Sequence, residues 1–169
     1  MTTTIETISV VLSSASYGVY HDDVLGRDRF EYNGTVYDDS QGSGTGDTFT
    51  ANDGNSYELV MVYKDPNGSG YEGALYKNSN GDYFRSHSGT EITDTGDIYA
   101  DIQIGLKNLP EDQVDAMLAF DSQIRLDFAA KSAPVPEMTE VGHSLGGAMA
   151  QIAGMIYGNE VIACPAPVY

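Results

Sequence analysis

The stretch from residue 138 to residue 164 has the sequence MTEVGHSLGGAMAQIAGMIYGNEVIAC. Its apolar pattern predicts a short strand over Met138–Val141, a glycine-rich turn over Gly142–Gly147 and a helix over Ala148–Tyr157. A second strand is predicted over Val161–Cys164, just before two prolines. A strand, a helix and a strand with such short joints indicate a parallel βαβ unit, so the chain is predicted to have an α/β fold.

Upstream of this unit, the sequence predicts an antiparallel meander. Three runs favour strands, namely Tyr57–Tyr63, Tyr71–Tyr76 and Asp82–Ser88. Residues that favour turns separate them, with Pro-Asn-Gly at 66–68 and Asn-Gly at 80–81. Consecutive strands joined by tight turns pair antiparallel, so these runs are expected to lie side by side.

Helices are predicted on both sides of the meander. Apolar residues at helical spacing indicate a helix over 5–16, a short helix within 97–104 and a helix that begins at Pro110 and continues to about Lys131. The segment 38–55 is rich in Gly, Asp, Ser and Thr and is predicted to be an exposed acidic loop. Residues 21–37 are mixed and polar and give no firm assignment.

Length and composition favour one domain. The chain has 169 residues, of which 41% are hydrophobic, too many for a disordered chain. No internal repeat and no linker divides residues 1–169, so they are predicted to form one domain or part of a larger one. No apolar run approaches the roughly 20 residues that span a bilayer.

The charge balance excludes some partners. Eight Lys and Arg against 25 Asp and Glu give a net charge of −17, which repels phosphate backbones and argues against nucleic-acid binding. Cys164 is the single cysteine, so no intrachain disulfide is expected. The first residues have no basic region and no cleavage site typical of a Sec signal peptide. Secretion by another route and a cytoplasmic location both stay open.

The glycine-rich turn carries the chemistry. Gly142-His143-Ser144-Leu145-Gly146 fits the G-x-S-x-G nucleophile elbow, in which a serine lies on a tight turn between a strand and a helix. The turn is crowded, so the residues two before and two after the serine must be small. The helix directs free N–H groups toward the reacting carbonyl oxygen, and the Leu145 N–H is the expected oxyanion donor.

These residues resemble a known family. The run GHSLGGAMAQIAG, residues 142–154, resembles the elbow and following helix of the class 3 lipase family, the α/β-hydrolases similar to fungal triacylglycerol lipases. Residues 73–91, 97–103 and 161–167 are similar to other segments of that family, and the loop 38–55 is unmatched. The resemblance covers roughly residues 5–169. It implies an incomplete α/β-hydrolase-type sheet, flanked by helices and preceded by the antiparallel meander.

The resemblance also implies roles for particular residues. Ser144 is the nucleophile, Leu145 and Thr90 supply the oxyanion N–H groups, and Gly142, His143 and Gly146 complete the elbow. The implied substrate is a lipid or another carboxylic ester, and no metal and no cofactor is implied.

The family places a lid near residues 92–104. There Ile98, Tyr99 and Ile102 form an apolar face that either meets lipid at a membrane surface or packs in the core.

Two positions depart from the family pattern. Ser88 stands where the family has an arginine, so the end of this strand is expected to lack its usual anchor. Glu140 lies in the strand before the elbow, where a buried carboxylate needs a partner. The sequence gives no account of Glu140.

The catalytic triad of the family is incomplete in this sequence. A serine needs a base, and in this fold the acid and then the histidine follow the serine along the chain. The residues after Ser144 include no His and no Asp, and Glu160 precedes a strand. Of His21, His87 and His143, only His87 is expected near the site, and the order of the triad along the chain argues against it as a substitute base.

The chain is therefore interpreted as the N-terminal portion of an ester hydrolase, inactive by itself. Its open sheet edge favours self-association. The alternatives are an inactive lipase-like binding module and, given the charge and the loop 42–55, a calcium-dependent module. A peptidase or thioesterase would use the same elbow.

Overall fold

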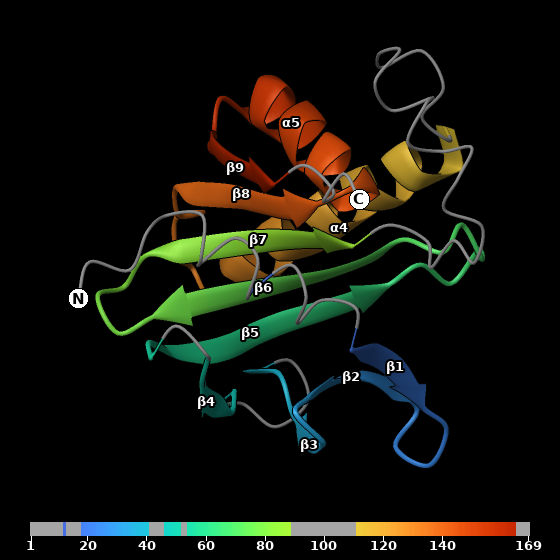
Figure 1. Cartoon of the computed structure of the whole chain (residues 1–169), viewed down its shortest axis with the longest axis vertical. Helices are drawn as coiled ribbons and strands as arrows, with labels where there is room; N and C mark the ends of the chain where they lie inside the picture. The colour runs from blue at the N-terminus through green and yellow to red at the C-terminus, as the bar shows by residue number, and fades with distance from the viewer. Residues whose placement is uncertain (1–11, 13–17, 41–45, 52–53, 89–110, 165–169) are drawn as a thin grey trace, which may run out of the picture.

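The computed structural model describes residues 12, 18–40, 46–51, 54–88 and 111–164. Figure 1 shows two sheets and two helices within these ranges. The strands are β1 (Val19–Asp22), β2 (Arg27–Tyr32), β3 (Thr35–Tyr37), β4 (Thr48–Thr50), β5 (Ser56–Lys64), β6 (Glu72–Asn78), β7 (Tyr83–Ser88), β8 (Met138–His143) and β9 (Glu160–Cys164). The helices are α4 (Glu111–Ala130) and α5 (Leu145–Tyr157).

The larger sheet has six strands in the order β4-β5-β6-β7-β8-β9. Neighbouring strands from β4 to β7 pair antiparallel, whereas β7, β8 and β9 pair parallel. The predicted meander and the predicted parallel βαβ unit are both confirmed. The chain is thus an α/β protein, and its mixed sheet carries the predicted elbow strand β8 between β7 and β9.

The two faces of the six-stranded sheet are covered differently. On one face, buried apolar side chains of β5, β6, β7 and β8 pack with Leu12 and with the three-stranded sheet β1-β2-β3. On the other face, apolar side chains of β5 and β6 pack against α4 and α5. In Figure 1 the small sheet lies beside β5, and the helices lie toward β8 and β9. The elbow is therefore on the helical side of the molecule.

The structure corrects two predictions from the sequence and assigns one stretch that the sequence left open. The segment 38–55 is not wholly an exposed loop, because Thr48–Thr50 forms β4 and buries Phe49 among aromatic rings. The unassigned stretch 21–37 contributes to the sheet β1-β2-β3, with an Asn33-Gly34 hairpin turn at positive φ. The elbow turn is shorter than predicted, because β8 ends at His143 and α5 begins at Leu145.

Several predictions fall outside the described residues. They are the helix over 5–16, apart from Leu12, the short helix within 97–104, and Pro110 at the start of α4. For the rest of that helix the prediction is confirmed, since α4 ends at Ala130. Among the described helices, neither is long and apolar enough to cross a membrane.

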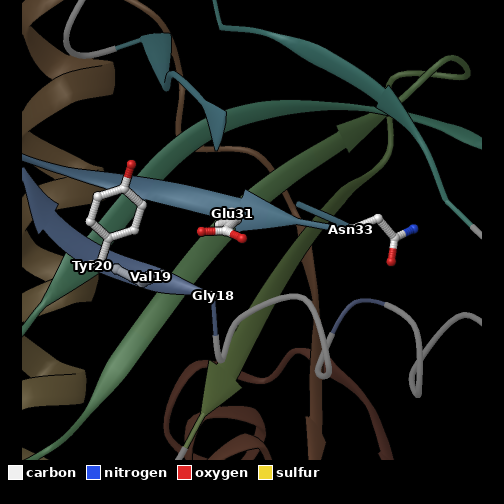
Figure 2. A pocket seen from close by; sticks show the side chains of 5 residues that line it. All are labelled: Gly18, Val19, Tyr20, Glu31 and Asn33. Carbon is white, nitrogen blue, oxygen red and sulfur yellow. The ribbon is translucent and has the colours of Figure 1, made fainter. Parts of the chain in front are cut away.

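A surface pocket of about 390 Å³ lies on the small sheet (Figure 2). Its lining residues belong to β1, β2 and the adjoining turns, namely Gly18, Val19, Tyr20, Glu31 and Asn33. It contains no residue of the elbow, so it is not the site that the motif predicts.

Candidate active site at the strand-to-helix turn

Ser144 is the single residue between β8 and α5. Its backbone has φ 57° and ψ −125°. Glycine adopts this conformation readily, but a residue with a Cβ is strained in it. This backbone conformation places the Ser144 side chain at a sharp bend, where the chain turns from strand to helix. This is the geometry that a nucleophile elbow requires.

Two glycines make the bend sterically feasible. A Cβ on Gly142 would lie 2.1 Å from the carbonyl oxygen of Gly146. A Cβ on Gly146 would lie 2.1 Å from the carbonyl oxygen of His87 in β7. Both distances are far below van der Waals contact with backbone atoms, which cannot move aside easily. The prediction that these two positions must be small is confirmed.

The first turn of α5 presents free polar groups beside Ser144. The amides of Gly147 and Ala148 donate to the Ser144 carbonyl oxygen, at 2.9 and 3.3 Å, and are the first bonds of the helix. The N–H of Leu145 precedes these bonds, so it has no partner within the helix. The half-buried Ser144 side chain makes no hydrogen bond that caps the helix. Its hydroxyl group is therefore not used to stabilise α5.

The remaining predicted site residues are placed as follows. His143 is the last residue of β8 and is partly exposed. The second predicted oxyanion residue, Thr90, and the predicted lid residues Ile98, Tyr99 and Ile102 lie outside the described residues. The structure thus brings together Ser144, Leu145 and the elbow glycines.

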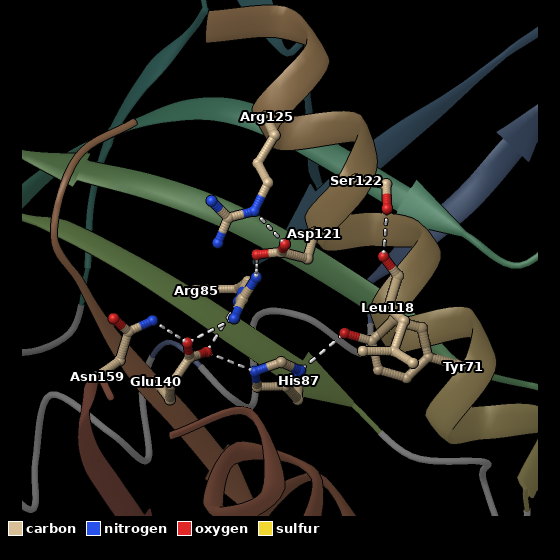
Figure 3. Close-up of polar contacts among 9 residues, drawn as sticks. All are labelled: Tyr71, Arg85, His87, Leu118, Asp121, Ser122, Arg125, Glu140 and Asn159. Carbon is tan, nitrogen blue, oxygen red and sulfur yellow. Dashed lines mark hydrogen bonds and ion pairs between the residues drawn. The ribbon is translucent and has the colours of Figure 1, made fainter. Parts of the chain in front are cut away.

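A buried polar cluster lies on the helical face of the sheet (Figure 3). Its central residue is Glu140 of β8, four positions before Ser144 in the sequence. Glu140 accepts four hydrogen bonds there. Arg85 Nη2 and Asn159 Nδ2 each donate to its Oε1 at 2.6 Å. Arg85 Nε and His87 Nε2 lie 2.9 and 2.8 Å from its Oε2. This carboxylate is fully satisfied, which explains how the strand tolerates it.

The charges in the cluster are balanced. Arg85 also donates to Asp121 of α4 at 2.5 Å, and Arg125 Nε donates to Asp121 at 2.6 Å. Burial by itself raises the pKa of the Glu140 carboxyl, but hydrogen bonds from His87 and Arg85 outweigh it and lower the pKa to about 2. Glu140 is therefore ionised in the folded protein, and Arg85 is its main countercharge.

Arg85 changes one expectation from the sequence. The substitution of Ser88 for an arginine was expected to leave the end of this strand without an anchor. In the structure Arg85, three residues earlier in β7, provides one, because it joins β7 to β8 and to α4. Ser88 itself donates to the carbonyl oxygen of Glu72 in β6 at 2.8 Å.

His87 does not have the position of a catalytic base. Its Nδ1 lies 2.7 Å from the Tyr71 hydroxyl and its Nε2 lies 2.8 Å from Glu140, and its side chain is fully buried. Burial lowers the pKa of the imidazole, and the hydrogen bond to Glu140 opposes this only in part. Because Glu140 is ionised, a neutral His87 donates from Nε2 and accepts from Tyr71 at Nδ1. Both nitrogens are occupied, so the structure, like the order of the residues along the chain, argues against His87 as a substitute base.

His21 is also held by another partner. His21 of β1 lies on the small sheet, with its Nδ1 3.0 Å from Asp28. Within the described ranges, no histidine side chain is hydrogen-bonded to Ser144. The same part of the chain contains no group of three or more His, Cys, Asp or Glu side chains arranged to hold a metal ion.

The buried cluster is what sequence reasoning missed. Arg85 and His87 alternate in β7 and therefore share one face of the sheet. Arg85 and Glu140 are direct partners in the parallel register. The available signal was a basic residue and an acidic residue, each in a strand that is otherwise buried. Their pairing could not be predicted without knowledge of the register between β7 and β8, because the two residues are 55 positions apart in the sequence.

Comparisons of the chain with protein-family models, with curated proteins and with solved structures gave no match in any of the three. The features that bear on function are therefore the geometry of the site and the sequence motif.

Proposed function

We propose that this chain is the nucleophile-bearing part of a serine ester hydrolase of the lipase type. The observation that supports the proposal is Ser144, held at positive φ between β8 and α5 by two glycines that no larger residue can replace. Backbone strain of this kind is concentrated at active sites and ligand-binding sites. The hydroxyl group takes no part in capping the helix, so it is available for chemistry.

In the proposed reaction, the Ser144 Oγ attacks the carbonyl carbon of an ester while a base removes its proton. The Leu145 N–H stabilises the negative oxygen that develops, aided by the positive end of α5. The C–O bond to the alcohol then breaks and the alcohol leaves with a proton. Water hydrolyses the acyl-enzyme and restores the serine.

The base and the acid are proposed to come from outside the described residues. His87 and His21 are both held by other partners. The same observation favours the second candidate function, an inactive lipase-like module that binds a partner or a lipid surface. The two candidates differ in whether Ser144 reacts.

The substrate class and the partners follow from the resemblance to class 3 lipases. A lipid or acylglycerol ester is the proposed substrate, with contact to a membrane surface through the segment that contains Ile98, Tyr99 and Ile102. The strand β9 forms one edge of the six-stranded sheet. Pairing of this edge with another strand is the proposed route of self-association.

Covalent labelling of the purified chain tests the proposal. A fluorophosphonate probe reacts with activated serines, and added imidazole can replace a missing base. We expect imidazole-dependent labelling that peptide mapping assigns to Ser144. The label should be absent in Ser144→Ala and retained in Ser122→Ala, which removes an exposed serine of α4.

Two results would contradict parts of the proposal. Labelling no stronger than in Ser144→Ala would reject the hydrolase and favour the binding module. Serine-dependent turnover of a short acyl ester by the chain alone, without imidazole, would show instead that acid and base lie within the 169 residues.

A further inference from the structure

We infer that His87 is a positioning residue for the Ser144 elbow, and that it acts as a neutral imidazole hydrogen-bonded on both sides. The inference deepens the proposed function and rests on it for the role of Ser144. It is carried by the position of His87 in the sheet, by its two hydrogen bonds and by the close backbone contact between β7 and α5.

The backbone of His87 is part of the elbow. In the parallel register of β7 and β8, His87 is paired with Gly142, two residues before Ser144. Its carbonyl oxygen occupies the space where Gly146 would carry a Cβ. The bend at Ser144 is thus closed on one side by the backbone of residue 87. A shift of this residue would remove the surface against which the first turn of α5 packs.

The side chain of His87 fixes that backbone position. It joins Tyr71, in the loop before β6, to Glu140 of β8, and neither hydrogen bond is exposed to water. Glu140 is held in turn by Arg85 and by Asn159, which precedes β9. His87 therefore belongs to a network that connects β7, β8, α4 and the residue before β9 (Figure 3).

Protonation of His87 would disturb this arrangement. A second N–H at Nδ1 would have to donate to the Tyr71 oxygen, so the Tyr71 hydroxyl would rotate and change from donor to acceptor. The new positive charge would be buried close to Arg85, in a cluster whose charges are already balanced. The titratable and charged groups around His87 from every packed element are Tyr63, Tyr71, Arg85, Asp121, Arg125, Glu140 and Tyr157. Only the two carboxylates among them are negative, and two arginines already neutralise them.

The sign of the pH effect follows from the direction of the shift. Burial lowers the pKa of His87 in the closed elbow, whereas a histidine exposed in an open elbow has its ordinary value of about 6.5. The open state then binds more protons at mildly acidic pH. The elbow is expected to open more readily as the pH falls below about 6.5, by up to about tenfold for each pH unit.

Two substitutions distinguish the effect of the two His87 hydrogen bonds from the effect of protonating its imidazole. His87→Gln keeps an acceptor toward Tyr71 and a donor toward Glu140 but cannot be protonated, whereas His87→Leu removes both hydrogen bonds. The measurement is the amide-exchange protection of Gly147 and Ala148, whose N–H groups bond to the Ser144 carbonyl. Phe49→Leu is the matched control, because it weakens the opposite face of the sheet.

We expect the protection in the native chain to fall by up to about tenfold between pH 7.5 and pH 5.5, and that in His87→Gln to change little. At pH 7.5, His87→Leu should lose protection at these amides while His87→Gln retains it. Imidazole-dependent labelling of Ser144 should follow the same order.

Equal loss of protection in Phe49→Leu and His87→Leu would overturn the inference, since the effect would be global unfolding. So would a pH profile of His87→Gln identical to that of the native chain, and this comparison holds even if His87→Leu does not fold. Absence of labelling in every form would reject the proposed hydrolase, but amide exchange would still decide the role of His87.

Discussion

The two faces of the six-stranded sheet are held by different forces. On the face toward the small sheet, seven aromatic side chains pack together, with Phe49 in contact with five of them at centroid distances of 5.3 to 6.1 Å. The others in this aromatic cluster are Phe30, Tyr32, Tyr37, Tyr57, Tyr76 and Phe84. On the helical face, beneath the elbow, a buried ionic cluster centred on Glu140 interrupts the apolar packing.

The difference matters for what each face can do. Dispersion and apolar burial are non-directional, so the aromatic cluster can adjust to a lost atom at a graded cost. Hydrogen bonds between buried charges are directional, and loss of one partner leaves the others unsatisfied. The ionic cluster thus fixes one arrangement of β7 and β8, which is the arrangement on which the strained Ser144 depends.

The largest expected effect comes from removal of the central carboxylate. In Glu140→Leu, Arg85 keeps only Asp121 as a buried countercharge, so the free energy of unfolding should fall by about 3–5 kcal/mol. Urea denaturation measures the change. Glu111→Leu, at an exposed position of α4, is the control and should change stability by less than about 0.5 kcal/mol. A loss in Glu140→Leu as small as in the control would show that the cluster is dispensable.

Acid should weaken the ionic face selectively. The pKa of Glu140 is about 2 in the folded protein and 4.5 without the fold's interactions, so the unfolded chain binds more protons between these values. Its contribution to stability is complete above pH 4.5 and is lost as the pH falls toward 2, on the order of 3 kcal/mol in all. Denaturation curves at pH 5 and pH 3 should therefore differ less for Glu140→Gln than for the native chain. Equal differences would place the acid sensitivity elsewhere.

A substitution in the aromatic cluster should have a smaller effect. Phe49→Leu keeps an apolar side chain at this buried position of β4, so the free energy of unfolding should fall by about 1 kcal/mol. Thermal and urea denaturation at pH 7 measure the loss. A loss as large as that of Glu140→Leu would contradict the expectation that the aromatic cluster tolerates a substitution better than the ionic cluster does.

A substitution at the elbow should change stability by a similarly small amount, with the opposite sign. Ser144→Gly removes the strain of a Cβ at φ 57°, so stability should rise by about 1 kcal/mol, whereas Ser144→Ala keeps the strain and should leave stability almost unchanged. Both variants should abolish labelling by the fluorophosphonate probe. If Gly and Ala at this position were equally stable, the backbone conformation would not be a source of strain.

Local patterns were sufficient for most of the secondary structure near the site. The runs of strand-favouring residues in β5, β6 and β7, the turn residues between them and the pattern of the helix after Ser144 are short-range signals, and they predicted the corresponding elements. Thr48–Thr50 was missed because one buried phenylalanine within a Gly- and Asp-rich segment leaves almost no periodic signal. What makes this segment a strand is the burial of Phe49 against rings from distant parts of the chain.

The sequence by itself determined the elbow motif, the small residues at Gly142 and Gly146, and the order of strand, turn and helix around Ser144. These features depend on neighbours within a few residues, where steric limits act directly. Only the tertiary structure decided the roles of Arg85, His87 and Glu140, which are set by the register between β7 and β8 and by the packing of α4. A buried charge is stable only if its partners arrive from elsewhere in the chain, and their arrival depends on the fold.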